Sequence, residues 1–338
     1  MNINKKIKIG LYSDFDKRFL NDKFLFSDSD DFYSRIFKDL IRSGFFLHTL
    51  DVFKKHKTIP NVCLFFDMPK RNLNKIVNIK KTKSILLIRE NLGIRKINFD
   101  LKKHKSFDRI LTWDKSLVDN KKYFFIPSGT SSNKKSKKIY EYEKKKLCTL
   151  INANKFSKAN GELYSKRLEI IKWFEKNRPE SFDLYGYGWD EFYLILFSKT
   201  IFRAKKLFNK RSSYKGTVKD KLSTLKKYKF AICFENNSID KGNITEKILD
   251  CFQAKVVPIY YGAPDIQEYI PESCYIDFRR FKNMESIYEY ISCLPKNKYQ
   301  KYLENIEAFL ESKNFYNLFT YEKAKETIIL SVRDSISI

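Results

Sequence analysis

The chain has 338 residues, of which 43% are hydrophobic and 16% are aromatic. This is enough apolar material for sizeable cores, so it excludes a disordered protein, and the length suggests about two domains. The formal net charge of +27 favours an anionic partner such as nucleic acid, a membrane surface or a phosphorylated small molecule. Because lysine is abundant together with Ile, Asn, Phe and Tyr, we assign at least half of this charge to solvated faces.

Six cysteines are spread along the chain, and no two of them are close enough for a CxxC metal or redox motif. Most lie in apolar runs, where a free thiol behaves as a small hydrophobic side chain, so we expect a reducing compartment. The N-terminal stretch has no apolar core typical of a signal peptide, and no run reaches about 18 apolar residues. We therefore expect a cytoplasmic protein without a membrane span.

In the first part of the chain, short apolar runs alternate with helical patterns, such as the helix predicted over residues 31–43. Strands that are apolar throughout and alternate with helices predict a parallel sheet covered on both faces. The expected strands are residues 7–12, 45–51, 62–66, 84–88, 109–113 and 123–126.

A second alternating set follows residues 128–146, a Ser-, Gly-, Asn- and Lys-rich stretch that we interpret as a linker. We predict one domain over residues 1–127, a second over 147–311 and a C-terminal helical segment over 312–338. The expected strands of this part are residues 147–151, 182–185, 230–234 and 256–260. The expected helices are residues 162–177, 219–227, 244–254, 284–292, 298–311 and 320–331.

Residues 189–211 join an apolar stretch to a basic one. We expect a core helix followed by a basic loop. The alternative is that this segment lies on an anionic membrane surface, which would make the protein peripheral on the inner membrane face.

The segment CFENNSIDKGNITEK, residues 233–247, separates an apolar run from an amphipathic one. Ligands of open parallel sheets lie outside the carboxyl ends of the strands, and a helix N-terminus suits a phosphate. Lys247 in the first helical turn would oppose the helix dipole unless an anion were bound, and Glu246 could accept two hydrogen bonds from a ribose diol. Helix capping by Asn243 or Thr245 explains the segment at least as well on local chemistry alone.

The longer pattern FENNSIDKGNITEKILDCFQAKVVPIYYGAPD, residues 234–265, resembles family 10 of the glycosyltransferases, the α-1,3/1,4-fucosyltransferases, in its bacterial type. That family has a strand ending in FEN, a helix that begins with TEK, and a VPI strand followed by G-x-P. The matching residues here are Thr245-Glu246-Lys247, Val257-Pro258-Ile259, Gly262 and Pro264.

Further segments resemble the same family. Those that resemble its donor domain are LCTLINANK (147–155), YSKRLEIIKWF (164–174) and FDLYGYGW (182–189). LLIREN (86–91) and HKSFDRILTWD (104–114) resemble its acceptor-domain strand and the segment after it. The resemblance is good over residues 147–282, fair over 84–127, and limited to the fold elsewhere.

The resemblance implies a GT-B-like α/β fold, with two Rossmann-like domains whose parallel sheets face a central cleft. It also implies that fucose is transferred from GDP-fucose with inversion, that no metal is strictly required, and that a divalent metal at most stimulates. The implied general base is Glu90, whereas Arg167 and Lys247 would contact the diphosphate and Glu246 the ribose. The other implied donor-site residues are Asn154, Asn243 and Glu235.

Some of these residues also have ordinary structural interpretations. Arg89-Glu90 at the end of an apolar strand is typical of a solvated pair, and Arg167 on a helix is typical of a surface charge. We expect Glu235 to hold the loop through backbone N–H groups. The chain departs from the family at Asn243, where an aromatic residue is common, and after Glu90, where Asn-Leu-Gly-Ile replaces the Ser-Pro of many relatives.

The expected function is α-1,3-fucosyl transfer to a glycan hydroxyl, on an N-acetylglucosamine or glucose unit of a surface polysaccharide or lipopolysaccharide. One alternative is a transferase of the same fold that uses another GDP-sugar. Another is a basic nucleic-acid-binding protein, although no helix-turn-helix, zinc-finger or RNP signature is present, so we expect no nucleic-acid partner. SDSDDF (27–32) has the Asp-x-Asp spacing typical of metal-dependent transferases, but we expect it to cap a helix. The scattered His48, His56 and His104 predict no metal site.

Overall fold

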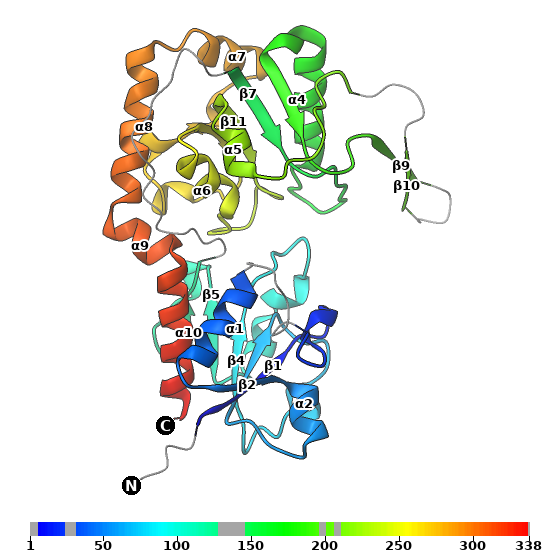
Figure 1. The fold of residues 1–338 in the computed structure, drawn as a ribbon, viewed down its shortest axis with the longest axis vertical. Helices are drawn as coiled ribbons and strands as arrows, with labels where there is room; N and C mark the ends of the chain where they lie inside the picture. Colours follow the sequence, from blue (N-terminus) through cyan, green and yellow to red (C-terminus); the bar gives the residue numbers. More distant parts are fainter. Residues whose placement is uncertain (1–5, 24–31, 128–145, 196–200, 206–210, 337–338) are drawn as a thin grey trace. The chain divides into compact units, whose positions relative to one another are not determined.

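The computed structural model describes residues 6–23, 32–127, 146–195, 201–205 and 211–336. The chain forms two compact units (Figure 1). Unit 1 consists of Met1–Thr130 and Asn317–Ile338, and unit 2 consists of Ser131–Tyr316.

Unit 1 contains a sheet of six parallel strands in the order β2-β1-β3-β4-β5-β6. Every one of these strands overlaps a strand predicted from the apolar runs. The strands are β1 (Lys8–Tyr12), β2 (Phe46–Thr49), β3 (Val62–Phe66), β4 (Lys83–Leu87), β5 (Arg109–Thr112) and β6 (Tyr123–Phe125). The helices are α1 (Phe32–Arg42), α2 (Leu50–Lys55), α3 (Leu101–His104) and α10 (Tyr321–Ile336), with short 3-10 turns at Lys17–Phe19, Leu73–Lys75, Lys96–Phe99 and Lys115–Leu117.

Strand β3 is buried along its whole length because both faces of its sheet are covered. Successive side chains of a strand point to opposite faces. Leu64 and Phe66 therefore pack on the face that α1 and α10 cover, whereas Cys63 and Phe65 pack with Phe107 on the other face. The unbroken apolar run 62–66 in the sequence is the signature of this two-sided burial.

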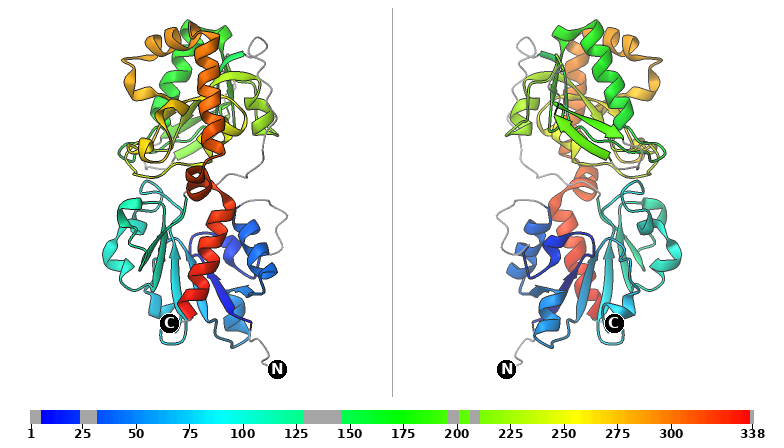
Figure 2. Two further views of the ribbon diagram at one scale, coloured as in Figure 1. Left: turned by 90° about the vertical axis from the view of Figure 1, so that its left-hand side faces the viewer. Right: turned by 90° about the vertical axis from the view of Figure 1, so that its right-hand side faces the viewer.

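The C-terminal helix α10 packs on the sheet of the N-terminal part of the chain (Figures 1 and 2). Its core side chains recur at helical spacing, so one face of the helix is apolar. They are Tyr321, Ala324, Ile328 and Val332. The hydroxyl of Tyr321 also donates to Asp39 Oδ2 in α1 at 3.1 Å. The chain thus leaves unit 1, forms unit 2, and returns.

Unit 2 contains a sheet of five parallel strands in the order β13-β12-β11-β7-β8. Only its short edge strand, β13, was not predicted. The strands are β7 (Lys146–Ile151), β8 (Phe182–Tyr185), β11 (Tyr228–Phe234), β12 (Val257–Tyr261) and β13 (Ile276–Asp277). The helices are α4 (Tyr164–Asn177), α5 (Lys221–Leu225), α6 (Glu246–Gln253), α7 (Met284–Ser292) and α8 (Lys296–Leu310), with 3-10 turns at Pro179–Ser181, Ile266–Glu268, Glu272–Cys274 and Phe278–Arg280. Helix α9 (Lys313–Phe319) begins in unit 2 and ends in unit 1.

The two sheets have the same strand order around their first strand. In each sheet, counting only its own strands in chain order, the second strand lies on one side of the first and the third lies on the other. This order places a topological switch between β1 and β3 in unit 1 and between β7 and β11 in unit 2. Ligands of such sheets bind beside the carboxyl ends of the strands at the switch. The α/β fold with two parallel sheets, expected from the sequence, is confirmed.

The helix predicted within residues 189–211 is wrong. The chain there forms an antiparallel pair of strands, β9 (Glu191–Ile195) and β10 (Ile201–Lys205), that lies apart from the five-stranded sheet (Figure 1). Residues 196–200 and 206–210 lie outside the described residues. A continuous apolar run does not distinguish helix from strand by periodicity, and the aromatic and β-branched residues of EFYLI and IFRAK favour strands.

Among the helices in the described parts of the chain, none combines the length and the apolar character needed to cross a bilayer.

Gly186 follows β8 and lies close to the backbone of Asn152, which follows β7, and a substitution can test this contact. Its φ is +129°, and a Cβ atom there would lie 1.9 Å from the carbonyl oxygen of Asn152. We expect Gly186→Ala to lower the free energy of unfolding by more than about 2 kcal/mol, because both the backbone strain and the clash oppose it. The matched control is Gly44→Ala, which has a φ of +90° and no neighbour within 4 Å, so only backbone strain of about 1 kcal/mol is expected. Urea denaturation of both variants is the measurement, and equal losses would contradict this account.

Candidate functional site

The polar segment singled out in the sequence connects the carboxyl end of β11 to the N-terminus of α6. Phe234 is the last residue of β11, and Thr245 is the N-cap of α6, whose hydroxyl accepts the backbone N–H of Lys247 at 3.5 Å. The helix forms because Ile248 and Phe252 bury its apolar face while Thr245 caps its start. The junction lies at the switch between β7 and β11, where a ligand of this fold is expected.

Glu235 ties the strand to the helix. Its side chain is only 1% exposed. Its carboxylate accepts hydrogen bonds from the backbone N–H of Thr245 at 2.8 Å, from the Thr245 hydroxyl at 2.7 Å and from Lys247 Nζ at 3.1 Å. Glu235 thus holds the loop, as expected, but of these three hydrogen bonds only the first comes from a backbone N–H, and the other two come from side chains.

The glycine after β12 makes room for this carboxylate. A Cβ atom at Gly262 would lie 2.5 Å from Glu235 Cγ and 2.5 Å from the hydroxyl oxygen of Tyr260. The same hydroxyl accepts the backbone N–H of Ala263 at 3.0 Å. A side chain larger than hydrogen at position 262 would displace Glu235, which is a physical reason for glycine in the sequence VPIYYG.

Lys247 is a cation held beside two oxygens. Its side chain is 13% exposed, and Nζ donates to Glu235 and, at 2.9 Å, to the hydroxyl of Thr245. Burial lowers the pKa of Lys247, but the negative charges of Glu235 and Glu246 outweigh it, so the pKa lies above its ordinary value. The positive charge of Arg167 opposes this rise in the pKa of Lys247, so the two cations are close enough to repel each other. Lys247 is therefore fully charged at neutral pH.

Arg167 is buried rather than on the surface, contrary to the ordinary interpretation of a charged residue on a helix. It projects from α4, and its Nη2 donates to the carbonyl oxygens of Phe234 at 2.7 Å and Glu235 at 2.6 Å, and to Asn236 Oδ1 at 3.2 Å. Burial lowers the pKa of Arg167, although arginine stays charged at neutral pH. Within the described part of the chain, its Nε has no hydrogen-bond acceptor.

The other donor-site residues implied by the sequence lie around the same switch. Glu246 is the exposed first residue of α6, and Asn243, which is buried, donates its backbone N–H to the carbonyl oxygen of Asp240 at 3.4 Å. Asn154 follows β7, and its side-chain amide donates to the carbonyl oxygen of Gly188 at 2.8 Å. Sequence reasoning did not single out Asn236, although its neighbour Glu235 in the FEN triplet could have drawn attention to it.

Glu90 belongs to unit 1, whereas the six implied donor-site residues belong to unit 2. It lies three residues after the last residue of β4, Leu87, and its side chain is half-buried. Its backbone N–H donates to Asp67 Oδ1 at 2.9 Å, and its carbonyl oxygen accepts Asn98 Nδ2 at 2.9 Å. The position of Glu90 is thus fixed through its backbone.

Asp67, which sequence reasoning missed, is the centre of this arrangement. It follows β3 with a φ of +65° and is 2% exposed. Its Oδ1 accepts the backbone N–H groups of Arg89 and Glu90 at 2.8 and 2.9 Å and Asn98 Nδ2 at 2.6 Å. Burial raises the pKa of Asp67, against the opposing effect of these hydrogen bonds. The signal in the sequence was a carboxylate directly after an entirely apolar strand.

The acidic stretch 28–31 lies outside the described residues, so its expected role as a helix cap is not described. In the parts of the chain that the structure describes, no group of three or more His, Cys, Asp or Glu side chains could hold a metal ion. Two of the histidines have structural partners: His48 Nδ1 lies 2.6 Å from Asp22 Oδ2, and His104 Nε2 lies 2.8 Å from the carbonyl oxygen of Asn98.

The role of Asp67 is testable by stability. Asp67→Ala would leave two backbone N–H groups without their acceptor and would remove one of the two acceptors of the Asn98 amide, so we expect a loss of about 2–4 kcal/mol in the free energy of unfolding. Asp67→Asn keeps an acceptor oxygen and should stay within about 1 kcal/mol of the wild type at neutral pH. Urea denaturation that gives equal losses for both variants would contradict this role.

The difference in stability between the wild type and Asp67→Asn should change with pH in one direction. Because burial raises the folded-state pKa of Asp67, the folded chain binds more protons than the unfolded chain above the ordinary carboxyl pKa of about 4. The stability of the wild type relative to Asp67→Asn should therefore fall as the pH rises from about 4 through the raised pKa. A relative stability that rises over this range would show that the folded-state pKa is lowered instead.

The sequence and the fold match known proteins. Residues 197–327 match the family model described as glycosyltransferase family 10 (fucosyltransferase) C-term. The chain is 34% identical over 117 residues to the α-(1,3)-fucosyltransferase FucT of Helicobacter pylori, covering 33% of this chain and 24% of that protein. It is 33% identical over 67 residues to an α-(1,4)-fucosyltransferase of Arabidopsis thaliana, covering 20% of this chain and 16% of that protein. The matches thus span about a quarter or less of these relatives.

The likeness to solved structures extends over the whole chain. The crystal structure of an α1,3-fucosyltransferase with GDP matches with a TM-score of 0.55 at 17% identity, covering 99% of this chain and 92% of that one. A glycosyltransferase from Rickettsia africae matches with a TM-score of 0.56 at 10% identity, covering 98% and 99%. At these identities the likeness shows the fold. The family match over residues 197–327 agrees with the resemblance that FENNSIDKGNITEK and the VPI strand indicated: this part of the chain is similar to the C-terminal domain of glycosyltransferase family 10.

Proposed function

We propose that this protein transfers fucose from GDP-fucose to a hydroxyl of a glycan acceptor, forming an α-1,3 linkage with inversion at the anomeric carbon. The junction between β11 and α6 carries the proposal. There, inside the matched family domain, two cations and an exposed carboxylate gather at a helix N-terminus. This combination is suited to a nucleoside diphosphate, whose phosphates need positive charge and whose ribose needs an acceptor.

Lys247 and the start of α6 would bind the diphosphate. An ammonium group has three N–H donors, and Glu235 and Thr245 take two of them. The third is left for a phosphate oxygen, and the N-terminal N–H groups of α6 add partial positive charge. The fixed position of Nζ favours this role, because a preorganised cation loses little freedom when it binds.

Arg167 would fix the turn after β11 and add positive charge for the diphosphate. Its Nη2 holds the carbonyl oxygens of Phe234 and Glu235 and so fixes the turn, while its guanidinium charge adds to that of Lys247. The buried Nε, which lacks an acceptor among the described residues, is a donor that fits a phosphate oxygen. Glu246 is exposed and is suited to the ribose hydroxyls.

The chemistry would be a single displacement. An acceptor hydroxyl attacks the anomeric carbon of fucose, and GDP leaves with growing negative charge on its terminal phosphate. Cations fixed at that phosphate stabilise the transition state more than the ground state. Glu90 would take the proton of the acceptor hydroxyl, a contribution of about 10²–10⁴-fold for a positioned base. The proposal requires no metal ion.

The acceptor is proposed as an N-acetylglucosamine or glucose unit of a surface polysaccharide or lipopolysaccharide, and the place of action as the cytoplasmic side of the membrane. The resemblance of the sequence to bacterial family 10 enzymes supports both. Neither strand of the β9–β10 pair is needed for this proposal.

Thermal stabilisation by nucleotides, without added metal, tests the donor. A ligand at about 100 times its dissociation constant adds about 2.7 kcal/mol to the free energy of unfolding. We expect shifts with GDP and GDP-fucose and none with UDP or UDP-glucose. A larger shift with GDP-mannose than with GDP-fucose would contradict the assignment of fucose as the transferred sugar. No shift with any GDP compound would contradict the assignment of the donor site.

Glu246→Gln tests the ribose contact without disturbing the core, because Glu246 is exposed. We expect the dissociation constant of GDP-fucose in calorimetry to rise about tenfold, since a charged acceptor of two hydroxyls is lost. The matched control is Glu285→Gln, which also changes a glutamate in the first turn of a helix in unit 2. Equal affinities of the two variants would exclude Glu246 from the donor site.

Lys247→Gln tests the cation at the diphosphate. We expect GDP affinity to fall more than tenfold, because a charge-assisted hydrogen bond to phosphate is lost. The substitution also leaves the buried Glu235 without its cation, so the free energy of unfolding must be measured on the same variant. A variant that folds and binds GDP with wild-type affinity would remove Lys247 from the site.

A further inference from the structure

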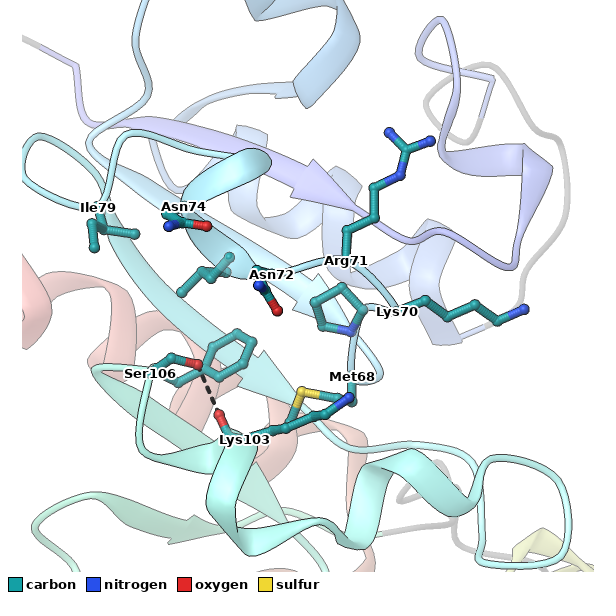
Figure 3. Close-up of a pocket in the computed structure, with 11 residues that line it drawn as sticks. Met68, Lys70, Arg71, Asn72, Asn74, Ile79, Lys103 and Ser106 are labelled. Carbon is teal, nitrogen blue, oxygen red and sulfur yellow. Dashed lines mark hydrogen bonds between the residues drawn. The ribbon is translucent and has the colours of Figure 1, made fainter.

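A pocket of about 370 Å³ lies beside the carboxyl end of β3 in unit 1, and nothing in the proposed function uses it (Figure 3). Its apolar wall includes Met68, Leu73 and Phe107. Asn72 and Ser106 add amide and hydroxyl groups to the lining. The volume falls within the range of small-molecule sites, which are mostly apolar with a few polar groups.

The charge of the pocket has one sign. Lys70, Arg71 and Lys103 line it, and no carboxylate does. In the described residues, none of these three cations forms an ion pair with an aspartate or glutamate side chain. Figure 3 shows Lys103 extending toward Met68, whereas Lys70 and Arg71 extend outward from the loop. An anionic group would therefore meet one cation beside the pocket wall and two at its rim.

The loop that forms the wall is fixed in place. The backbone N–H of Lys70 donates to Asp14 Oδ2 at 2.6 Å, and that of Met68 donates to Asn98 Oδ1 at 2.7 Å. Arg95 Nη2 donates to the carbonyl oxygen of Met68 at 2.6 Å. A wall held at both ends of the turn is preorganised, so little conformational freedom is lost when a ligand binds.

The same contacts connect the pocket to the proposed base. Met68 follows Asp67, which binds the backbone N–H of Glu90, and Asn98 bonds to both Met68 and the Glu90 carbonyl oxygen. The Asp14–Lys70 contact spans the switch between β1 and β3, where ligands of this fold are expected. A molecule in the pocket would thus lie against the loop that also fixes Glu90.

We propose that this pocket binds an acidic sugar unit of the acceptor glycan, one that carries a phosphate or a carboxylate, and so selects the acceptor. The inference rests on the proposed function, in which Glu90 activates an acceptor hydroxyl. The apolar wall would pack against the C–H face of the sugar, and Asn72, Asn74 and Ser106 would bind its hydroxyls. Lys103, Lys70 and Arg71 would neutralise the acidic group.

Calorimetry on the full chain at low ionic strength tests this proposal. The probes are N-acetylglucosamine 6-phosphate, glucuronic acid, neutral N-acetylglucosamine and inorganic phosphate. We expect one or both acidic sugars to bind more tightly than the neutral sugar and than inorganic phosphate. Their affinity should fall as salt is added. Tighter binding of the first probe assigns a phosphorylated unit, and tighter binding of the second assigns a uronic acid. Equal binding of neutral and acidic sugars, or of inorganic phosphate and the sugar phosphate, would overturn the proposal.

Substitutions of exposed lysines on α3 locate the binding. We expect Lys103→Gln to weaken binding of the acidic sugar about five- to tenfold and Lys103→Arg to retain most of the affinity. The control is Lys102→Gln, which changes the neighbouring exposed lysine of the same helix, outside the pocket lining. Equal affinities of Lys103→Gln and Lys102→Gln would show that the pocket is not the site.

GDP titration of the same variants separates this inference from the proposed function. Because the pocket belongs to unit 1 and the junction to unit 2, GDP affinity should be unchanged in Lys103→Gln. GDP binding without acidic-sugar binding would overturn the pocket proposal alone. Acidic-sugar binding without GDP binding would overturn the proposed function and, with it, the acceptor role of the pocket.

Discussion

The donor site proposed here depends on the buried carboxylate of Glu235. It joins the end of β11 to the start of α6, because it accepts the Thr245 backbone N–H and hydroxyl and the Lys247 ammonium. Removing one partner of such a buried pair typically loses about 3–5 kcal/mol, so the carboxylate and Lys247 stabilise each other's position. Gly262 leaves space for the Glu235 side chain, and Arg167 donates to the backbone carbonyl oxygens of Phe234 and Glu235.

Unit 1 has a similar arrangement, in which a buried acid follows a strand and binds a later segment of the chain. The third strand of each sheet ends in a phenylalanine followed by a buried acid, Phe66-Asp67 in β3 and Phe234-Glu235 in β11. Asp67 accepts the backbone N–H groups of Arg89 and Glu90, and Glu235 accepts that of Thr245. In both cases the segment that donates carries the residue with the proposed role, Glu90 or Lys247. In each unit a buried acid at a topological switch thus fixes the segment that carries the residue with a proposed role, at the edge where ligands of this fold bind.

The sequence predicted the parallel sheets because their strands are apolar throughout, and it predicted the β11–α6 junction because polar residues there interrupt two apolar runs. It did not predict β9 and β10, since an apolar run of that length is compatible with helix or strand. The pairing of Tyr321 with Asp39 joins residues 282 positions apart, so the sheet that α10 covers could not be read from local pattern. Asp67 was missed for the same reason: its partners Arg89, Glu90 and Asn98 lie more than 20 positions later in the chain.

Hydrogen–deuterium exchange of the full chain with and without GDP-fucose tests the central claim most directly, because it reports where the donor binds. With GDP-fucose we expect slower exchange of the backbone N–H groups over residues 235–249, which include the turn after β11 and the first turn of α6, and no such change with UDP-glucose. Protection elsewhere in the chain, with residues 235–249 unchanged at saturating GDP-fucose, would contradict the assignment of this junction as the nucleotide site.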